Sequence, residues 1–166
     1  MLTRRFSRIE LALVMLVVAI VAQAVFSRTL RYFEVAEKAA MTITILEVER
    51  GMRVRLALSA MGNAAAPAAK VQDANPFEFA HAVPPNYLGE LGENADMSGL
   101  PRGNWFYDPA RREIAYVPRL SSRLKGPDGE EVAVLRFRVE RWGGPRGLPH
   151  LASVSAYRWE PEFGTF

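Results

Sequence analysis

Glu10 is the residue whose type and position suggest chemistry most strongly, because it opens a long apolar segment. Residues 11–26 read LALVMLVVAIVAQAVF, in which only Gln23 is polar. An ionised carboxylate in hydrocarbon costs several kcal/mol unless it is paired. Glu10 therefore suggests charge pairing, with a cation on another chain or with Arg8 if the side chain snorkels to the interface.

The remaining candidates for chemistry stand alone in the sequence. His81 and His150 have no acid or nucleophile at the spacing of a known catalytic motif, and the chain has no cysteine. The acids of the loops do not follow the spacing of an oxygen-ligand calcium site. We therefore expect no catalytic residue, no metal site, no cofactor and no small-molecule substrate, and we expect that the protein is not an enzyme.

The distribution of charge argues against nucleic acid as a partner. The 166 residues carry a net charge of +3, and residues 1–31 alone contain five arginines against one glutamate. The other 135 residues contain 16 basic and 17 acidic side chains and are nearly neutral. The excess of positive charge thus flanks the apolar segment, and the rest of the chain lacks a basic patch of the kind that binds phosphates.

The apolar segment has the length of a single membrane span. Residues 9–26 form an apolar run of 18 residues, which as a helix would cover about 27 Å of the roughly 30 Å hydrocarbon core. Three arginines precede the run and two follow it, which favours a cytoplasmic N-terminus and a translocated C-terminal part. A cleavable signal peptide with an A-x-A site at residues 22–24 is the alternative.

Beyond the membrane the pattern becomes that of an amphipathic helix. The first glycine is Gly51 and the first proline is Pro67, so we expect one long helix over residues 6–62, with a bend at Gly51. Glu34 and Lys38, and likewise Glu49 and Arg53, have the spacing of helical ion pairs. Apolar residues recur every three or four positions on three tracks: Leu30, Phe33, Ala36, Ala40 and Ile43; Ile45, Val48, Met52 and Leu56; Val54, Leu58 and Met61.

The C-terminal part reads as an irregular region followed by a sheet. Residues 63–103 are rich in small residues and prolines and predict a variable loop region. Residues 104–107, 113–118, 132–140 and 151–159 have strand character and are separated by turn signals at 108–112 and 126–129. We expect an α+β fold, in which a four-stranded antiparallel sheet in residues 104–166 packs on the outer half of the helix. Arg136, Arg138 and Arg141 would then lie on the solvated outer face.

The N-terminal segment resembles that of type IV pilins and type II secretion pseudopilins. Phe6 takes the place of the phenylalanine that becomes the first residue after leader cleavage, and Glu10 takes the place of the glutamate four positions later. In that outline, residues 1–5 are a short basic leader or a cytoplasmic tail. The resemblance implies a bacterial inner-membrane, single-pass subunit whose C-terminal domain is periplasmic or extracellular.

The same resemblance implies that the partners are other pilin or pseudopilin subunits and the assembly platform. Glu10 would be the assembly charge that neutralises the N-terminal amine of a neighbouring subunit. Arg5, however, stands where the family has a glycine before the cleaved bond, so Arg5 and Phe6 form an atypical processing site. The alternative is an uncleaved single-pass envelope protein whose exported domain binds a partner.

The sequence thus generates a prediction about the N-terminus. Because arginine is too large for a cleavage site that accepts a small residue, we expect the purified protein to keep Met1 or its near neighbours. Intact-mass spectrometry of the purified protein measures this directly. A mature chain that starts at Phe6, especially one with a methylated amine, would refute the prediction.

Overall fold

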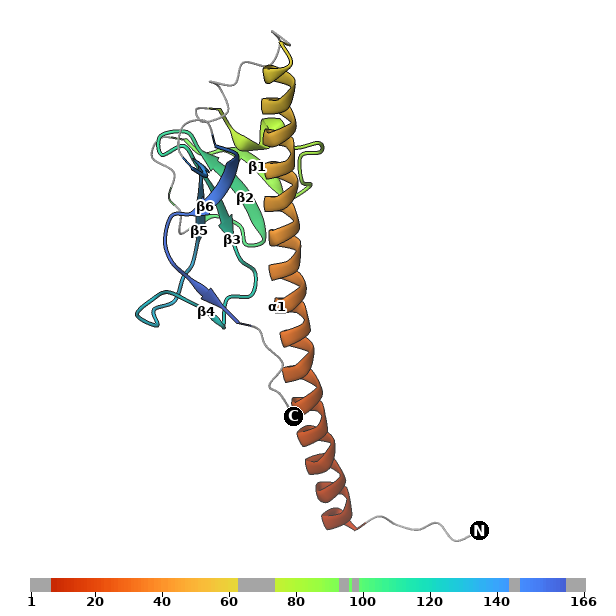
Figure 1. Cartoon of the computed structure of the whole chain (residues 1–166). Coiled ribbons are helices and arrows are strands. Elements are labelled where there is room, and N and C mark those ends of the chain that lie inside the picture. The colour runs from red at the N-terminus through yellow and green to blue at the C-terminus, as the bar shows by residue number, and fades with distance from the viewer. Residues whose placement is uncertain (1–6, 63–73, 93–95, 97–98, 144–146, 161–166) are drawn as a thin grey trace.

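The computed structural model describes residues 7–62, 74–92, 96, 99–143 and 147–160 of the chain. It has an α+β fold, in which one long helix runs along a small domain of two sheets (Figure 1). The elements in chain order are α1 (Arg8–Ala60), the short 3-10 helix η2 (Pro76–Phe79), β1 (Tyr87–Glu90), β2 (Asn104–Asp108), β3 (Glu113–Val117), β4 (Leu124–Lys125), β5 (Leu135–Arg141), β6 (Pro149–Ser153) and β7 (Arg158–Trp159).

Helix α1 is continuous over 53 residues, as the sequence predicts. Ser7 caps its N-terminus in a capping box: the Ser7 hydroxyl accepts from the Ile9 amide, and Glu10 accepts from the Ser7 amide at 2.8 Å. At the other end Gly62 adopts a φ of 81°, the left-handed conformation that commonly ends a helix. Residues 42–45 are Thr-Ile-Thr-Ile, a β-branched run that favours a strand. They are nevertheless helical, because the helix continues on both sides of them.

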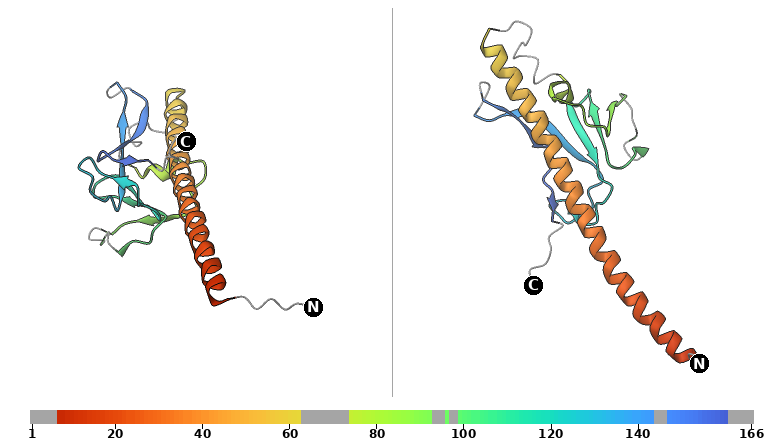
Figure 2. Two further views of the ribbon diagram at one scale, coloured as in Figure 1. Left: turned by 90° about the horizontal axis from the view of Figure 1, so that it is seen from below. Right: turned by 90° about the vertical axis from the view of Figure 1, so that its right-hand side faces the viewer.

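The first half of α1 stands free of the domain. The two views of Figure 2 show the helix running past the domain and extending alone toward its N-terminus. This part is long and apolar enough to cross a membrane, and none of its most apolar stretch is buried in the structure. Its large side chains, from Ile9 to Phe26, are more than half exposed. Such a surface fits lipid and is unfavourable in water.

The main sheet differs from the expected four-stranded antiparallel sheet. It has five strands in the order β1-β2-β3-β5-β6, and β1 pairs with β2 in parallel. The extra strand, Tyr87–Glu90, lies in the region predicted to be irregular loop. The hairpin of β2 and β3 has the predicted turn, in which the Arg111 amide donates to the Asp108 carboxylate and Arg112 takes a φ of 55°.

The predicted last strand is also wrong, because residues 151–159 divide between two sheets. β6 pairs with β5, whereas β7 pairs with β4 in a separate two-stranded sheet. Residues 154–157 carry the chain from one sheet to the other. Leu124, in the segment that follows the predicted strand 113–118, lies in β4.

The core lies between the inner face of the main sheet and one face of α1. Trp105, Phe137 and Leu151 from the sheet pack with Met41, Val48 and Met52 from the helix. Of the three apolar tracks, only the one that contains Val48 and Met52 is buried. The tracks that contain Phe33 and Ile43, and Val54 and Leu58, remain exposed. A smaller cluster of Leu91, Phe106 and Val117 covers part of the outer sheet face.

Gly51 lets the loop region approach the helix closely. A Cβ atom on Gly51 would lie only 1.7 Å from the carbonyl oxygen of Phe79, at the end of η2. The role of this glycine is therefore close packing, whereas a bend was expected from the sequence. η2 also supplies Phe77, which is buried against Trp105 with ring centroids 5.7 Å apart.

We predict that Gly51→Ala destabilises the domain by about 1–3 kcal/mol, the usual cost of overpacking a close contact. The gain in helix propensity, about 1 kcal/mol, offsets part of this cost. The measurement is urea denaturation of the detergent-solubilised protein, followed by the fluorescence of its buried tryptophans. Gly92→Ala is the matched control, since a Cβ there meets no atom within 4 Å. An unchanged Gly51→Ala midpoint would show that η2 does not press on the helix.

Candidate functional site

The helix and the domain are joined by a carboxylate that is almost fully enclosed. Glu34 is 1% exposed, because it lies on the helix face that points toward the small sheet. Its oxygens accept from the Arg123 amide at 3.0 Å, the Arg123 guanidinium at 3.0 Å, the Ser122 hydroxyl at 3.1 Å and the Trp159 indole N–H at 3.1 Å. A buried charge is tolerated only with such a full set of donors.

Glu37 makes a second connection one turn further along the helix. Its carboxylate accepts from the backbone amides of Arg119 and Leu120 at 2.6 and 3.0 Å and from the Tyr116 hydroxyl at 2.8 Å. Burial, together with the hydrogen bond to Glu37 and its charge, raises the pKa of the Tyr116 phenol. Tyr116 therefore stays protonated as a donor. One backbone segment, 119–123, thus holds two helix carboxylates.

The ion pairs predicted along the helix are formed only in part. Glu49 pairs with Arg53 at 2.9 Å, as expected. Glu34 pairs instead with Arg123, and the Lys38 ammonium donates to the Trp159 carbonyl. These two helix residues serve the contact with the domain, because Trp159 and Arg123 offer partners on the buried side of the helix.

Glu49 also closes an edge of the main sheet. Its carboxylate accepts from the Leu151 amide at 2.9 Å. β6 is an edge strand, so a backbone N–H on its free side would otherwise invite pairing with another chain. We call Glu34, Glu37 and Glu49 the helix carboxylates. All three bind backbone amides of the domain and set its position along α1.

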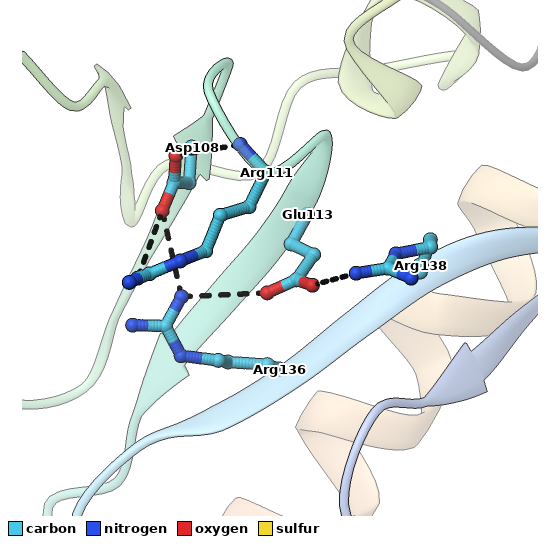
Figure 3. A network of polar contacts seen from close by, with 5 residues as sticks. All are labelled: Asp108, Arg111, Glu113, Arg136 and Arg138. Carbon is cyan, nitrogen blue, oxygen red and sulfur yellow. Dashed lines mark hydrogen bonds and ion pairs between the residues drawn. The ribbon is translucent and has the colours of Figure 1, made fainter. Parts of the chain in front are cut away.

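The outer sheet face carries a second polar cluster, drawn in Figure 3. Glu113 is 2% exposed and lies between Arg138 and Arg136, with oxygen–nitrogen distances of 2.5 and 3.4 Å. Asp108 accepts from Arg136 and Arg111, both at 3.5 Å. The register explains the grouping, because Glu113 stands opposite both Asp108 and Arg138.

We call these five residues the outer arginine cluster. Its two carboxylates are buried, whereas the side chains of Arg111 and Arg138 are more than half exposed. Arg136 and Arg138 therefore lie on the outer face, as predicted, but buried acids hold them in place. The groups exposed to solvent on this part of the sheet are guanidinium groups, and the buried carboxylates beneath them hold them in position.

Glu10, the predicted assembly charge, lies in the first turn of α1. Its carboxylate is exposed and occupied by the Ser7 amide of its own chain. The predicted processing residues, Arg5 and Phe6, lie outside the described residues. The resemblance drew attention to Glu10, whereas the helix carboxylates were missed because charges on a helix ordinarily indicate a solvated face.

The two histidines are far apart in the fold and do not form a common site. His81 lines a groove of about 460 Å³ between α1 and η2, together with Arg50, Val54 and Glu78. His150 lies on β6 and stacks on the exposed Trp142 with ring centroids 5.5 Å apart. Within the described ranges, no three histidine, aspartate or glutamate residues gather as metal ligands would.

A second groove lies close to the part of the helix that is long and apolar enough to span a membrane. It has a volume of about 660 Å³ and is mainly apolar. Leu30, Phe33 and Ala40 from α1 form one wall, and Pro85 and Leu120 from the domain lie opposite. Leu30 follows the apolar stretch by one turn, so this groove opens directly beside the end of that stretch.

Comparison of the chain with protein-family models, with curated proteins and with solved structures finds no match. The functional argument therefore depends on the geometry of the chain itself: a helix long and apolar enough to span a membrane, a domain fixed to it by buried carboxylates, an exposed apolar helix surface, and partly exposed arginines held by buried acids.

We predict that Glu34→Ala lowers the free energy of unfolding by about 3–5 kcal/mol, because the variant leaves buried donors and the Arg123 charge without an acceptor. Glu34→Gln should lose less, since its amide oxygen still accepts. Denaturation of the detergent-solubilised protein, followed by tryptophan fluorescence, measures both. The control is Glu47→Ala, which removes a half-exposed carboxylate that pairs with Arg50 at 3.5 Å and should change stability by less than about 0.5 kcal/mol. Equal stabilities of Glu34→Ala and Glu47→Ala would show that the buried contacts of Glu34 do not hold the domain to the helix.

Proposed function

We propose that this chain is a pilin-like structural subunit, a minor pilin or pseudopilin, of a type IV pilus or type II secretion apparatus. It acts by assembly: α1 holds the subunit in the inner membrane and then packs with the helices of other subunits. The N-terminus lies in the cytoplasm and the domain lies on the far side of the membrane.

The observation that carries this proposal is an apolar stripe on the outer half of α1 that the domain leaves uncovered. The stripe continues beyond the lipid-facing part, where water would otherwise surround it. Phe33, Ile43 and Val54 are each more than half exposed, and the small residues Ala36 and Ala40 lie between them. The members recur at helical spacing in two parts, Phe33, Ala36, Ala40 and Ile43, and then, beyond the charged pair Glu47 and Arg50, Val54 and Leu58; together they are here called the exposed stripe.

The length of the exposed stripe favours another helix as its partner. It runs for about 38 Å, from Phe33 to Leu58. It lies on a face of α1 beside the one that carries Met41, Val48 and Met52, which the domain buries. A second helix of the same kind, anchored in the same membrane, presents a matching apolar surface of the same length and direction. Ridges formed by residues three and four apart are the surfaces through which helices pack.

The apolar groove above the membrane supports the same proposal. It is lined by Phe33 and Ala40 of the exposed stripe and by Leu120 of the domain. A neighbouring helix that leaves the membrane beside α1 would meet this groove first. Assembly would then bury surface both in the lipid and above it.

The alternative function is an uncleaved single-pass envelope protein whose exported domain binds a partner. The capping box favours it, because Glu10 already has an acceptor role within its own chain. Arg5 in place of the usual glycine favours it as well. In this alternative, α1 stays in the membrane and the exposed stripe contacts a single partner helix.

We predict that Ile43→Lys removes the protein from filaments while leaving the domain folded, since a charge in a helix interface cannot be desolvated without a partner. The measurement is shearing of cells that produce the protein, followed by immunoblotting of the released filaments and the membranes. The control is Thr42→Lys, an exposed position on the flank of the helix, which should still be incorporated. Glu10→Ala should also abolish incorporation.

Two results of this experiment would contradict the assembly proposal. One is full retention of the unaltered protein in membranes with none in the sheared fraction, which favours the anchored binder. The other is normal incorporation of both Ile43→Lys and Glu10→Ala, which would show that neither the exposed stripe nor the assembly charge is used.

A further inference from the structure

The outer arginine cluster has the properties of a preformed receptor for carboxylates. Glu113 and Asp108 are buried and each contacts two arginines, so the guanidinium groups are held in place before any partner arrives. Three arginines face two acids, which leaves one positive charge uncompensated. In Figure 3 the guanidiniums of Arg111 and Arg136 extend to the same side of the cluster. Arginines arranged in this way bind carboxylates with little further loss of conformational entropy.

The same domain presents a negative counterpart at its other end. Asp128, Glu130 and Glu131 are exposed in the turn after β4, and Lys125 pairs with Glu131 at 3.4 Å. This acidic turn is also ordered by its own hydrogen bonds. The Gly126 amide donates to the Glu130 carbonyl at 2.9 Å, and the Asp128 amide donates to the Glu130 carboxylate at 3.0 Å. The turn therefore offers at least two uncompensated negative charges in a fixed shape.

The two surfaces lie at different heights above the membrane. The acidic turn follows β4, whose partner strand β7 carries Trp159, the residue that contacts Glu34 near the lower end of the domain. Figure 1 shows this turn projecting downward and away from the helix. The outer arginine cluster lies toward the other end of the main sheet, because β3 runs from Glu113 down to the segment that contacts Glu37.

This difference in height determines how two copies can meet. Copies that sit side by side in a flat membrane have equal heights, so the acidic turn of one lies at the level of the acidic turn of the other. If one copy is raised along the helix axis, its acidic turn moves up to the level of the neighbour's outer arginine cluster. The contact is thus available only between copies displaced along the axis.

We propose that the outer arginine cluster of one copy binds the acidic turn of a second copy raised along the axis, in a head-to-tail contact. The inference rests on the proposed assembly function and names the contact that the domains make within it. Complementary charge favours this register, and the like charges of two copies at equal height disfavour lateral association in the membrane. A head-to-tail contact leaves one free surface at each end and so can repeat indefinitely.

Cysteine cross-linking tests the contact, because the chain has no cysteine of its own. One copy carries Arg111→Cys and a second, differently tagged copy carries Asp128→Cys. We expect a disulfide-linked heterodimer when both are produced together, and a ladder of higher oligomers when one chain carries both substitutions. Each single variant alone should give no disulfide-linked homodimer, because the two surfaces differ.

Charge reversal adds a second measurement with a matched control. Arg111→Glu and Glu130→Arg should each reduce incorporation into the sheared filament fraction about tenfold, as expected for like charges brought together. Mixing the two variants should restore incorporation, since each supplies the charge that the other lacks. Glu78→Arg reverses an exposed charge on η2, away from the proposed contact, and should have no such effect.

The outcomes separate this inference from the proposed function. Filaments that contain the protein, without a cross-link between positions 111 and 128, overturn the contact and leave assembly standing. Cross-linked copies in membranes with no protein in filaments overturn filament assembly and also the requirement that the two copies be displaced along the axis. Homodimers of Arg111→Cys alone, or a disulfide from it to a different protein, overturn the head-to-tail pairing of copies.

Discussion

The fold depends on an interaction that is unusual for a helix surface: carboxylates buried against backbone amides. Glu34 and Glu37 bind the segment 119–123, and Glu49 binds β6. Apolar packing alone would hold the domain against α1 but would let it slide or rotate, because hydrophobic contact is not directional. Hydrogen bonds to fixed amides remove that freedom. The same helix face thus supplies adhesion through Met41, Val48 and Met52 and position through its glutamates.

The sequence predicted the helix well and the sheet only in part. A continuous helix follows from fifty residues without glycine or proline, and that inference needs no tertiary information. The hairpin of β2 and β3 follows from its turn residues. The parallel pairing of β1 does not, because a four-residue strand that contains Gly89 between prolines and glycines gives no alternating pattern. The sequence does not predict the break between β6 and β7 either, since residues 154–157 include types that favour a strand.

The buried carboxylates show a different limit of reading a sequence. Glu34 lies seven residues before Met41, which lies seven before Val48, so all three share one helix face. Hydrophobic periodicity counts only apolar residues, and it therefore gave three apolar tracks without showing which of them the sheet covers. The partners of Glu34 come from positions about ninety and 125 residues away. Only the fold reveals that this charge belongs to the inside.

Two attachments at different levels make the helix and the domain a single mechanical body. Glu34 and Gly51 lie about 26 Å apart along α1, and the domain is fixed at both. A rotation of the free half of the helix about its axis therefore turns the domain with it. The acidic turn projects away from the helix axis (Figure 1). A small rotation of the helix about its axis thus moves the acidic turn through a larger distance than any residue of the helix.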